Sequence, residues 1–497
     1  MKSQTVKSQD PDMIKNKQEN TIAKKKSSRI ASLDFFRGLA IVFMLIYHVI
    51  MHIYDYEWLT DYNQLLEVNI IILILMGLAA FFGTWHGFFL FISAIVNAYV
   101  IIKKKQKNQS SKSIISKQVF TGSLLIFLGW FEQAFGYDGY FGKVIRGGSW
   151  TNFSPLYGAL FEADTLKAIG FCLIVNSILL TNLLSNNNEL RFKRNMSIFL
   201  LLSVIIFVTT ALLRHFIPTF SWLYDETPGS MINLTSIAKT KGTFAAWFLA
   251  ITTGGLVPIF PFLGTSFIGT MIGLCLANPK ITKKTPLWWI ISGLGFMILG
   301  GLLIGFNAPF TTIEVNAALS TYFIRLGGQI MVIWAVLYFI EFNKRGEQFA
   351  NNVIVRFFRL WGIVSLTIYL FQIFVYVPRL LQQVIFGGVF NINFMDDHVI
   401  PRGQELLIVL TLVFVLVIFH GIIYLWSKIN FIGSLEWSIT QLQNITLPRT
   451  QQKRKKFDVN QLMNNVHWIA FPLSKKEDSD ESIISLTPDK NDEEPEK

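Results

Sequence analysis

The sequence predicts an all-α fold, a polytopic bundle of about ten transmembrane helices. Of its 497 residues, 52% are hydrophobic and only 15% are charged, whereas a soluble domain carries about 25% charged residues. The apolar residues also gather in runs that are long enough to cross about 30 Å of hydrocarbon as a helix. We therefore expect lipid, rather than a soluble core, around most of the chain.

Apolar runs of this length fall at ten places along the chain. They lie near 34–54, 84–102, 119–136, 163–184, 196–216, 254–277, 287–306, 321–341, 358–380 and 404–428. The segment 65–83 is also apolar, and the charge of the loops decides whether it counts as an eleventh crossing.

Cytoplasmic loops of membrane proteins are enriched in lysine and arginine. With ten crossings and a cytoplasmic N-terminus, four basic loops fall on the inside: 103–118, 185–195, 278–286 and 342–357. The outer loops 55–65 and 307–320 contain neither Lys nor Arg. An eleventh crossing would invert this distribution. We therefore expect a multi-pass protein of the cell membrane with both termini in the cytoplasm, and a re-entrant or tilted segment at 65–83.

This distribution explains most of the formal net charge of +12, so nucleic acid is not an expected partner. We divide the chain into a disordered basic tail (1–28), a transmembrane domain (29–437) and a polar cytoplasmic tail (438–497). The first region lacks the short apolar core of a removable signal peptide. Cys172 and Cys275 stand alone in apolar runs, which predicts buried thiols rather than a metal site.

The first span carries the strongest functional signal. Arg37 and His48 are eleven residues apart, which on a helix is three turns plus about 20° and a rise of about 16 Å. Both therefore face one side of the helix, and Asp34 is spaced to pair with Arg37. Ionisable side chains inside a span usually face a cavity or the bundle interior. The alternative is that Arg37 reaches the lipid headgroups and His48 hydrogen-bonds a neighbouring helix. His48 and His52 have metal-ligand spacing, but no third ligand is evident, so we predict no metal.

Several segments resemble a known group of enzymes. "SLDFFRGLAIVFMLIYH" (32–48) resembles the opening helix of acyltransferase family 3 and of heparan-α-glucosaminide N-acetyltransferase-like membrane proteins. Weaker resemblances to segments of these families are "WHGFFLFISAIV", "FEADTLKAIGFCLIV", "PIFPFLGTSFIGTMIG", "WGIVSLTIYLFQ" and "FIGSLEW", so that the similarity covers most of 29–437. The chain departs from family 3 in lacking an Arg-Arg pair after the second span, where 103–107 is rich in lysine instead.

The resemblance implies transfer of an acyl group, often acetyl, from cytoplasmic acyl-CoA to a hydroxyl or amine of a cell-surface glycan or lipid. Acyl-CoA would be a co-substrate, with no bound cofactor. Neutral imidazole suits removal of the acceptor's proton, and His48 is the first candidate. The N-acetyltransferase branch implies a loop histidine instead, which here is His86. We expect Arg37, with Lys103 and Lys104, to bind the donor phosphates.

Three further residues are candidates for the acceptor site. Arg325, Glu132 and Asp164 are predicted near the outer ends of their spans. Arg325 fits a cavity wall and a side chain that reaches the interface equally well. Glu132 and Asp164 can orient a histidine or bind a sugar hydroxyl, but solvation at the interface is the favoured interpretation of both carboxylates. Gln372 and His420 more simply join helices through hydrogen bonds. A transporter for a small polar solute and a catalytically inactive relative remain alternative functions, and a homodimer is one option for assembly.

Overall fold

The computed structural model describes most of the chain between Ile30 and Asn464. The described residues are 30–55, six positions within 70–82, and 86–135, 140–145, 150–151, 163–184, 191–217, 243–254, 257–278, 281–282, 284–305, 319–343, 345–401, 403–446 and 457–464. Most of the predicted re-entrant segment 65–83 lies outside these residues.

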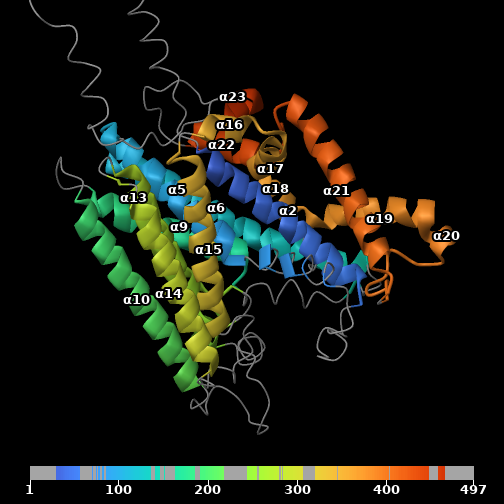
Figure 1. Cartoon of the computed structure of the whole chain (residues 1–497), viewed down its shortest axis with the longest axis horizontal. Helices are drawn as coiled ribbons and strands as arrows, with labels where there is room; N and C mark the ends of the chain where they lie inside the picture. The colour runs from blue at the N-terminus through green and yellow to red at the C-terminus, as the bar shows by residue number, and fades with distance from the viewer. Residues whose placement is uncertain are drawn as a thin grey trace, which may run out of the picture.

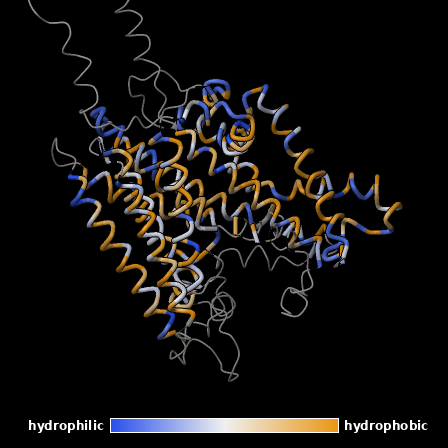
Figure 2. Tube along the Cα trace, in the orientation of Figure 1, coloured by the Kyte–Doolittle hydropathy of each residue, from blue (hydrophilic) through white to orange (hydrophobic). Residues whose placement is uncertain are grey.

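The helical membrane fold is confirmed, because ten helical stretches within the described residues are long and apolar enough to cross a membrane. They are α2 (Ala31–Ile53), α5 (His86–Gln106), α6 (Ser111–Phe135), α9 (Thr165–Leu183), α10 (Phe192–Phe216), α13 (Ile259–Ala277), α14 (Thr285–Gly305), α15 (Leu319–Ile340), the run Gln372–Phe390 and α21 (Glu405–Lys428). Hydrophobic residues follow these helices along nearly their whole length, with hydrophilic residues gathered at the helix ends (Figure 2). The protein is therefore a multi-pass membrane protein.

One half of the bundle is built around α13, which is buried along almost its full length. It packs against α5, α9 and α10, while α14 and α15 pair alongside (Figure 1). Small residues allow this close approach. A Cβ added at Gly269 would lie 2.8 Å from the Phe91 carbonyl oxygen, and one at Gly273 would lie 2.6 Å from that of Ile95. At both glycines, α13 and α5 are therefore packed with their backbones close together.

The ninth span differs from the predicted continuous helix over 358–380. The chain here forms a series of short helices: α17 (Val353–Ile363), α18 (Ser365–Leu370), η4 (Gln372–Val375), α19 (Tyr376–Gln382), η5 (Gln383–Gly387) and α20 (Gly388–Phe390). The break between α17 and α18 exposes backbone amides, and a side chain from a distant helix binds them. The Glu436 carboxylate accepts hydrogen bonds from the Leu366 and Thr367 N–H groups at 2.7 and 3.3 Å. This distant partner makes the break tolerable within the bundle.

The predicted domain boundary after residue 437 falls inside α22 (Leu435–Thr446). Gln443 of α22 donates to Thr121 of α6 at 2.8 Å. Arg359 of α17 donates to the carbonyl oxygen of Met463, at 3.0 Å, in α23 (Val459–Asn464). Within the described residues, packing against the bundle therefore continues past residue 437 in α22 and α23.

Two interhelical hydrogen bonds agree with the simpler of the sequence interpretations. The Gln372 amide contacts the Met44 sulfur at 3.4 Å and so joins η4 to α2. Trp361 Nε1 donates to His420 Nδ1 at 3.2 Å and joins α17 to α21. Both residues thus act as links between helices, as predicted.

The first span, α2, crosses α17 at two glycines. A Cβ at Gly38 would overlap the carbonyl oxygen of Phe358, and a Cβ at Gly362 would overlap that of Asp34. Backbone therefore meets backbone at this crossing, and neither helix can withdraw without losing the contact. This crossing fixes the position of Arg37, the residue before Gly38.

We predict that Gly38→Ala destabilises the protein by about 1–3 kcal/mol or more, because the added methyl group has no room. Gly295→Ala in α14 is the matched control, since nothing lies within 4 Å of a Cβ there. Thermal unfolding in detergent measures both. Equal melting temperatures for the two variants would contradict the close α2–α17 crossing.

Candidate functional site

A cavity of about 310 Å³ lies between α2, α5, α6, α9, α18 and α22. Its polar lining residues come from all six helices: Arg37, Ser93, Asn97, Thr121, Thr165, Ser365, Tyr369, Glu436 and Thr440. The apolar part of the wall consists of Phe89, Val96, Leu125, Leu166, Ile169, Leu366, Ile439 and Phe457. We call this space the Arg37–Glu436 cavity, after the two ionisable residues in its wall that have opposite charge. Its mixed lining is typical of a small-molecule site.

Arg37 enters the cavity from the second turn of α2. Its Nη2 donates to the Ser365 hydroxyl at 3.2 Å, which fixes the guanidinium at the start of α18. Two helices distant in sequence are thus tied at this point. A guanidinium held in place in a cavity is a suitable binding group for phosphate or carboxylate.

Glu436 reaches the same cavity from the first turn of α22. Besides the two amide bonds at the start of α18, its other carboxylate oxygen accepts the Thr367 hydroxyl at 2.5 Å. Burial raises the pKa of Glu436 above its ordinary value, while these hydrogen bonds and the positive charge of Arg37 act in the opposite direction. The cavity therefore holds a carboxyl group that takes up a proton more readily than an exposed glutamate does.

Two predicted acceptor residues, Glu132 and Asp164, lie within electrostatic range of the hydroxyl group of Tyr369, which lines the cavity. Asp164 also caps α9, because it accepts the Lys167 N–H at 2.8 Å, and its other oxygen lies 3.0 Å from Lys167 Nζ. These bonds give Asp164 a structural role in addition to its place beside the cavity.

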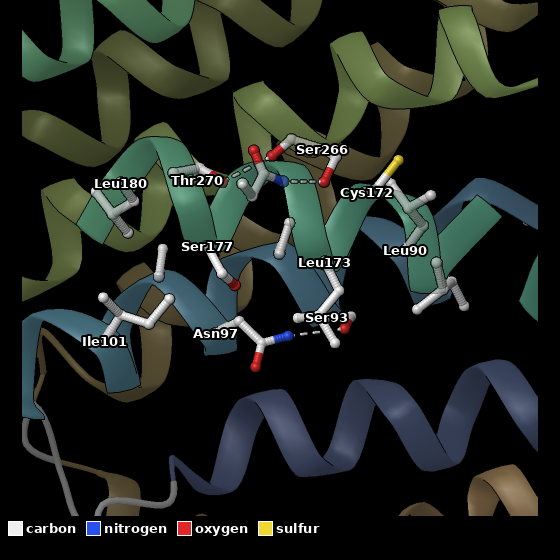
Figure 3. A pocket seen from close by; sticks show the side chains of 14 residues that line it. Leu90, Ser93, Asn97, Ile101, Cys172, Leu173, Ser177, Leu180, Ser266 and Thr270 are labelled. Carbon is white, nitrogen blue, oxygen red and sulfur yellow. Dashed lines mark hydrogen bonds between the residues drawn. The ribbon is translucent and has the colours of Figure 1, made fainter. Parts of the chain in front are cut away.

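A second, much smaller cavity of about 10 Å³ lies between α5, α9 and α13. Figure 3 shows Ser93 and Asn97 on α5, Ser177 on α9, and Ser266 and Thr270 on α13 around it. Its volume fits a single water molecule. Ser93 and Asn97 also line the larger cavity, so polar side chains continue from one space to the other.

His48 does not belong to the lining of the Arg37–Glu436 cavity. It lies on the other half of α2, where its ring centroid is 6.1 Å from that of Tyr47. Arg325 of α15 is within electrostatic range of the same Tyr47. The structure thus places Arg37 at one depth of the bundle and His48 at another, and Arg325 lies within electrostatic range of Tyr47, the residue before His48.

The structure does not place the remaining predicted site residues in the wall of the large cavity. His86 is the first residue of α5, and its side chain lies outside the described residues. Lys103 Nζ lies 5.5 Å above the Tyr99 ring in the last turns of α5, and neither Lys103 nor Lys104 lines the large cavity. Asp34 is buried in the first turn of α2.

The sequence interpretation overlooked Glu436 and Ser365, which both line the cavity. Both stand in the segments "FIGSLEW" and "WGIVSLTIYLFQ" that carry the resemblance. The available signal was a lone carboxylate one residue before a tryptophan, just past the last span. That pattern also fits an interfacial residue, so the contact with α18 was needed to reveal its place.

No family model matches this chain, and no curated protein matches it. The site offers a fixed cation, a buried carboxyl group and hydroxyl or amide groups around a partly open space, next to an apolar wall.

We predict that the stability of the wild type falls as pH rises from about 4.3, the unfolded pKa of glutamate, through the raised pKa of Glu436. The folded state binds more protons than the unfolded state in this window, so raising the pH favours unfolding. Glu436→Gln keeps both amide acceptor bonds and removes this dependence. As the pH is lowered through this window, the melting temperature of the wild type should therefore rise relative to that of Glu436→Gln.

Comparing Glu436→Ala with Glu436→Gln separates the effect of the hydrogen bonds from the effect of the charge. It leaves the Leu366 and Thr367 N–H groups without this acceptor, which costs about 1–3 kcal/mol at any pH. A Glu436→Ala protein as stable as Glu436→Gln would contradict the role of this carboxylate at the helix break.

Proposed function

We propose that this protein is a membrane acyltransferase that moves an acyl group, with acetyl as the first choice, from acyl-CoA to a hydroxyl or amine of a cell-surface glycan or lipid. The observation that carries the proposal is the Arg37–Glu436 cavity, in which a fixed guanidinium stands beside an apolar wall. This combination suits a donor that has phosphates at one end and an acyl chain at the other. Acyl-CoA is the co-substrate, and the proposal includes no bound cofactor.

The orientation of the cavity agrees with a cytoplasmic donor. Lys and Arg cluster in the loops at the Arg37 end of the bundle, which by the positive-inside rule is the cytoplasmic side. Both termini are then cytoplasmic, and the protein resides in the cell membrane. Lys103 and Lys104 are in the last turn of α5. There they raise the local concentration of the anionic donor rather than contact it within the cavity.

The histidines supply the proton chemistry. The acceptor must lose a proton as it attacks the thioester carbonyl, and neutral imidazole is suited to take it near neutral pH. His48 lies on α2 about 16 Å beyond Arg37, and His86 begins the next span. Either can act on the acyl group as base or nucleophile. We assign acceptor binding to Arg325, which is within electrostatic range of Tyr47, and to Glu132, which is within electrostatic range of Tyr369. Asp164 positions its end of α9.

Radiolabelled acetyl-CoA supplied to inside-out vesicles of the native membrane tests the proposal. We expect the label to become covalently attached to a glycan or lipid. We expect Arg37→Ala to raise the KM for acetyl-CoA at least tenfold, because a charged hydrogen bond contributes about 1.5–3 kcal/mol. Lys112→Ala, at an exposed position in the first turn of α6, is the control for general loss of charge. His48→Ala and His86→Ala, assayed side by side, identify the working histidine.

If the wild type transfers no label and proteoliposomes show solute flux without any acyl donor, the protein is a transporter and not an acyltransferase. If Arg37→Ala has the same KM as the wild type, the Arg37–Glu436 cavity does not bind the donor.

A further inference from the structure

The Ile53 end of α2 holds a second cluster of ionisable side chains, away from the Arg37–Glu436 cavity. His52 Nδ1 lies 3.7 Å from Asp397 Oδ1, and Asp397 belongs to the segment between α20 and α21. This segment is hydrogen-bonded to the end of α2. His398 N donates to His52 O at 2.8 Å, and Ile400 N donates to Ile53 O at 3.0 Å. The histidine and the carboxylate thus meet across two pieces of backbone that are fixed to each other.

Asp397 is held in turn by Arg379 of α19. Arg379 Nη1 lies 3.7 Å from Asp397 Oδ1. The guanidinium is fully buried and donates to the carbonyl oxygens of Phe394 and Asp396, at 2.8 and 2.9 Å. A buried cation with these bonds has little freedom to move, so it sets the place of the carboxylate beside it.

We infer that His52 is a catalytic base of the acyl transfer, with Asp397 and Arg379 as positioning residues; this rests on the proposed function. A carboxylate beside Nδ1 favours the tautomer that carries its proton there, and the ring then presents Nε2 as the proton acceptor. The His52 side chain is 16% exposed and that of Asp397 is 30% exposed, so an acceptor molecule can reach the pair. The 3.7 Å separation is longer than a hydrogen bond, and the proposed role requires the pair to close to hydrogen-bond distance when substrate is bound.

The step balances without any further reactant. The acceptor oxygen or nitrogen attacks the acyl carbonyl, and its proton passes to His52 Nε2. The new ester or amide bond forms as the bond from the acyl carbon to the CoA sulfur breaks, and CoA leaves as the thiolate. The imidazolium then releases its proton to water.

The position of His52 suits an acceptor that approaches from the side opposite to Arg37. Fifteen residues separate Arg37 from His52 on α2, a rise of about 22 Å. His48 lies between them, one turn before His52, and neither histidine lines the Arg37–Glu436 cavity. Removal of the acceptor's proton then falls to His52, and His48 or His86 acts on the acyl group as nucleophile.

The test uses inside-out native-membrane vesicles, radiolabelled acetyl-CoA and four variants of the full chain. We expect His52→Ala to lower kcat by about 10²–10⁴-fold, with the KM for acetyl-CoA unchanged and added imidazole restoring part of the rate. Asp397→Asn should lower kcat in the same direction, and Asp397→Glu should recover part of it. Asn393→Ala is the structural control, because it removes the 2.8 Å bond from Asn393 to Asp396 in the same segment without touching His52.

A full rate for His52→Ala would overturn the inference, as would a loss that follows the melting temperature and that imidazole does not restore. Either result leaves the proposed function intact as long as the wild type transfers label. Failure of the wild type to transfer label would be a failure of the proposed function itself, and the two outcomes are thereby distinguished.

Discussion

The contact of the Glu436 carboxylate with the start of α18 is the constraint on which much of this structure depends. Backbone N–H groups within a membrane must find partners inside the protein. At the break between α17 and α18, Glu436 accepts two of these groups and the Thr367 hydroxyl. The same carboxylate lies in the wall of the large cavity with Arg37. A single side chain thus completes a broken helix and sets the charge of the cavity.

The packing of α2 against α17 works together with this contact. Because Gly38 and Gly362 let the two backbones touch, Arg37 is brought to the helix break, where Ser365 accepts its hydrogen bond. Only glycine fits at positions 38 and 362, because any Cβ there would overlap the backbone of the other helix. A cavity wall built from α2, α18 and α22 requires that all three helices keep this spacing.

The two ends of α2 have different chemical characters. Arg37 stands at one end beside a carboxyl group and an apolar wall, and His52 stands at the other beside Asp397. A helix that carries a cationic group at one depth and imidazoles at another links the two sides of a membrane along one rigid element. This arrangement suits a reaction whose two substrates arrive from opposite sides.

The sequence by itself determined the helical class, eight of the ten spans to within five residues at both ends, and the linking roles of Gln372 and His420. Hydropathy and helical spacing are local properties, so they can be read along the chain. Only the tertiary structure decided that α6 begins eight residues before the predicted third span, that the ninth span is broken and that α22 and α23 pack against the bundle. It also decided that Ser365 meets Arg37 from 328 residues away. Those contacts depend on which helices pack together, and the spacing of residues along one helix carries no information about its neighbours.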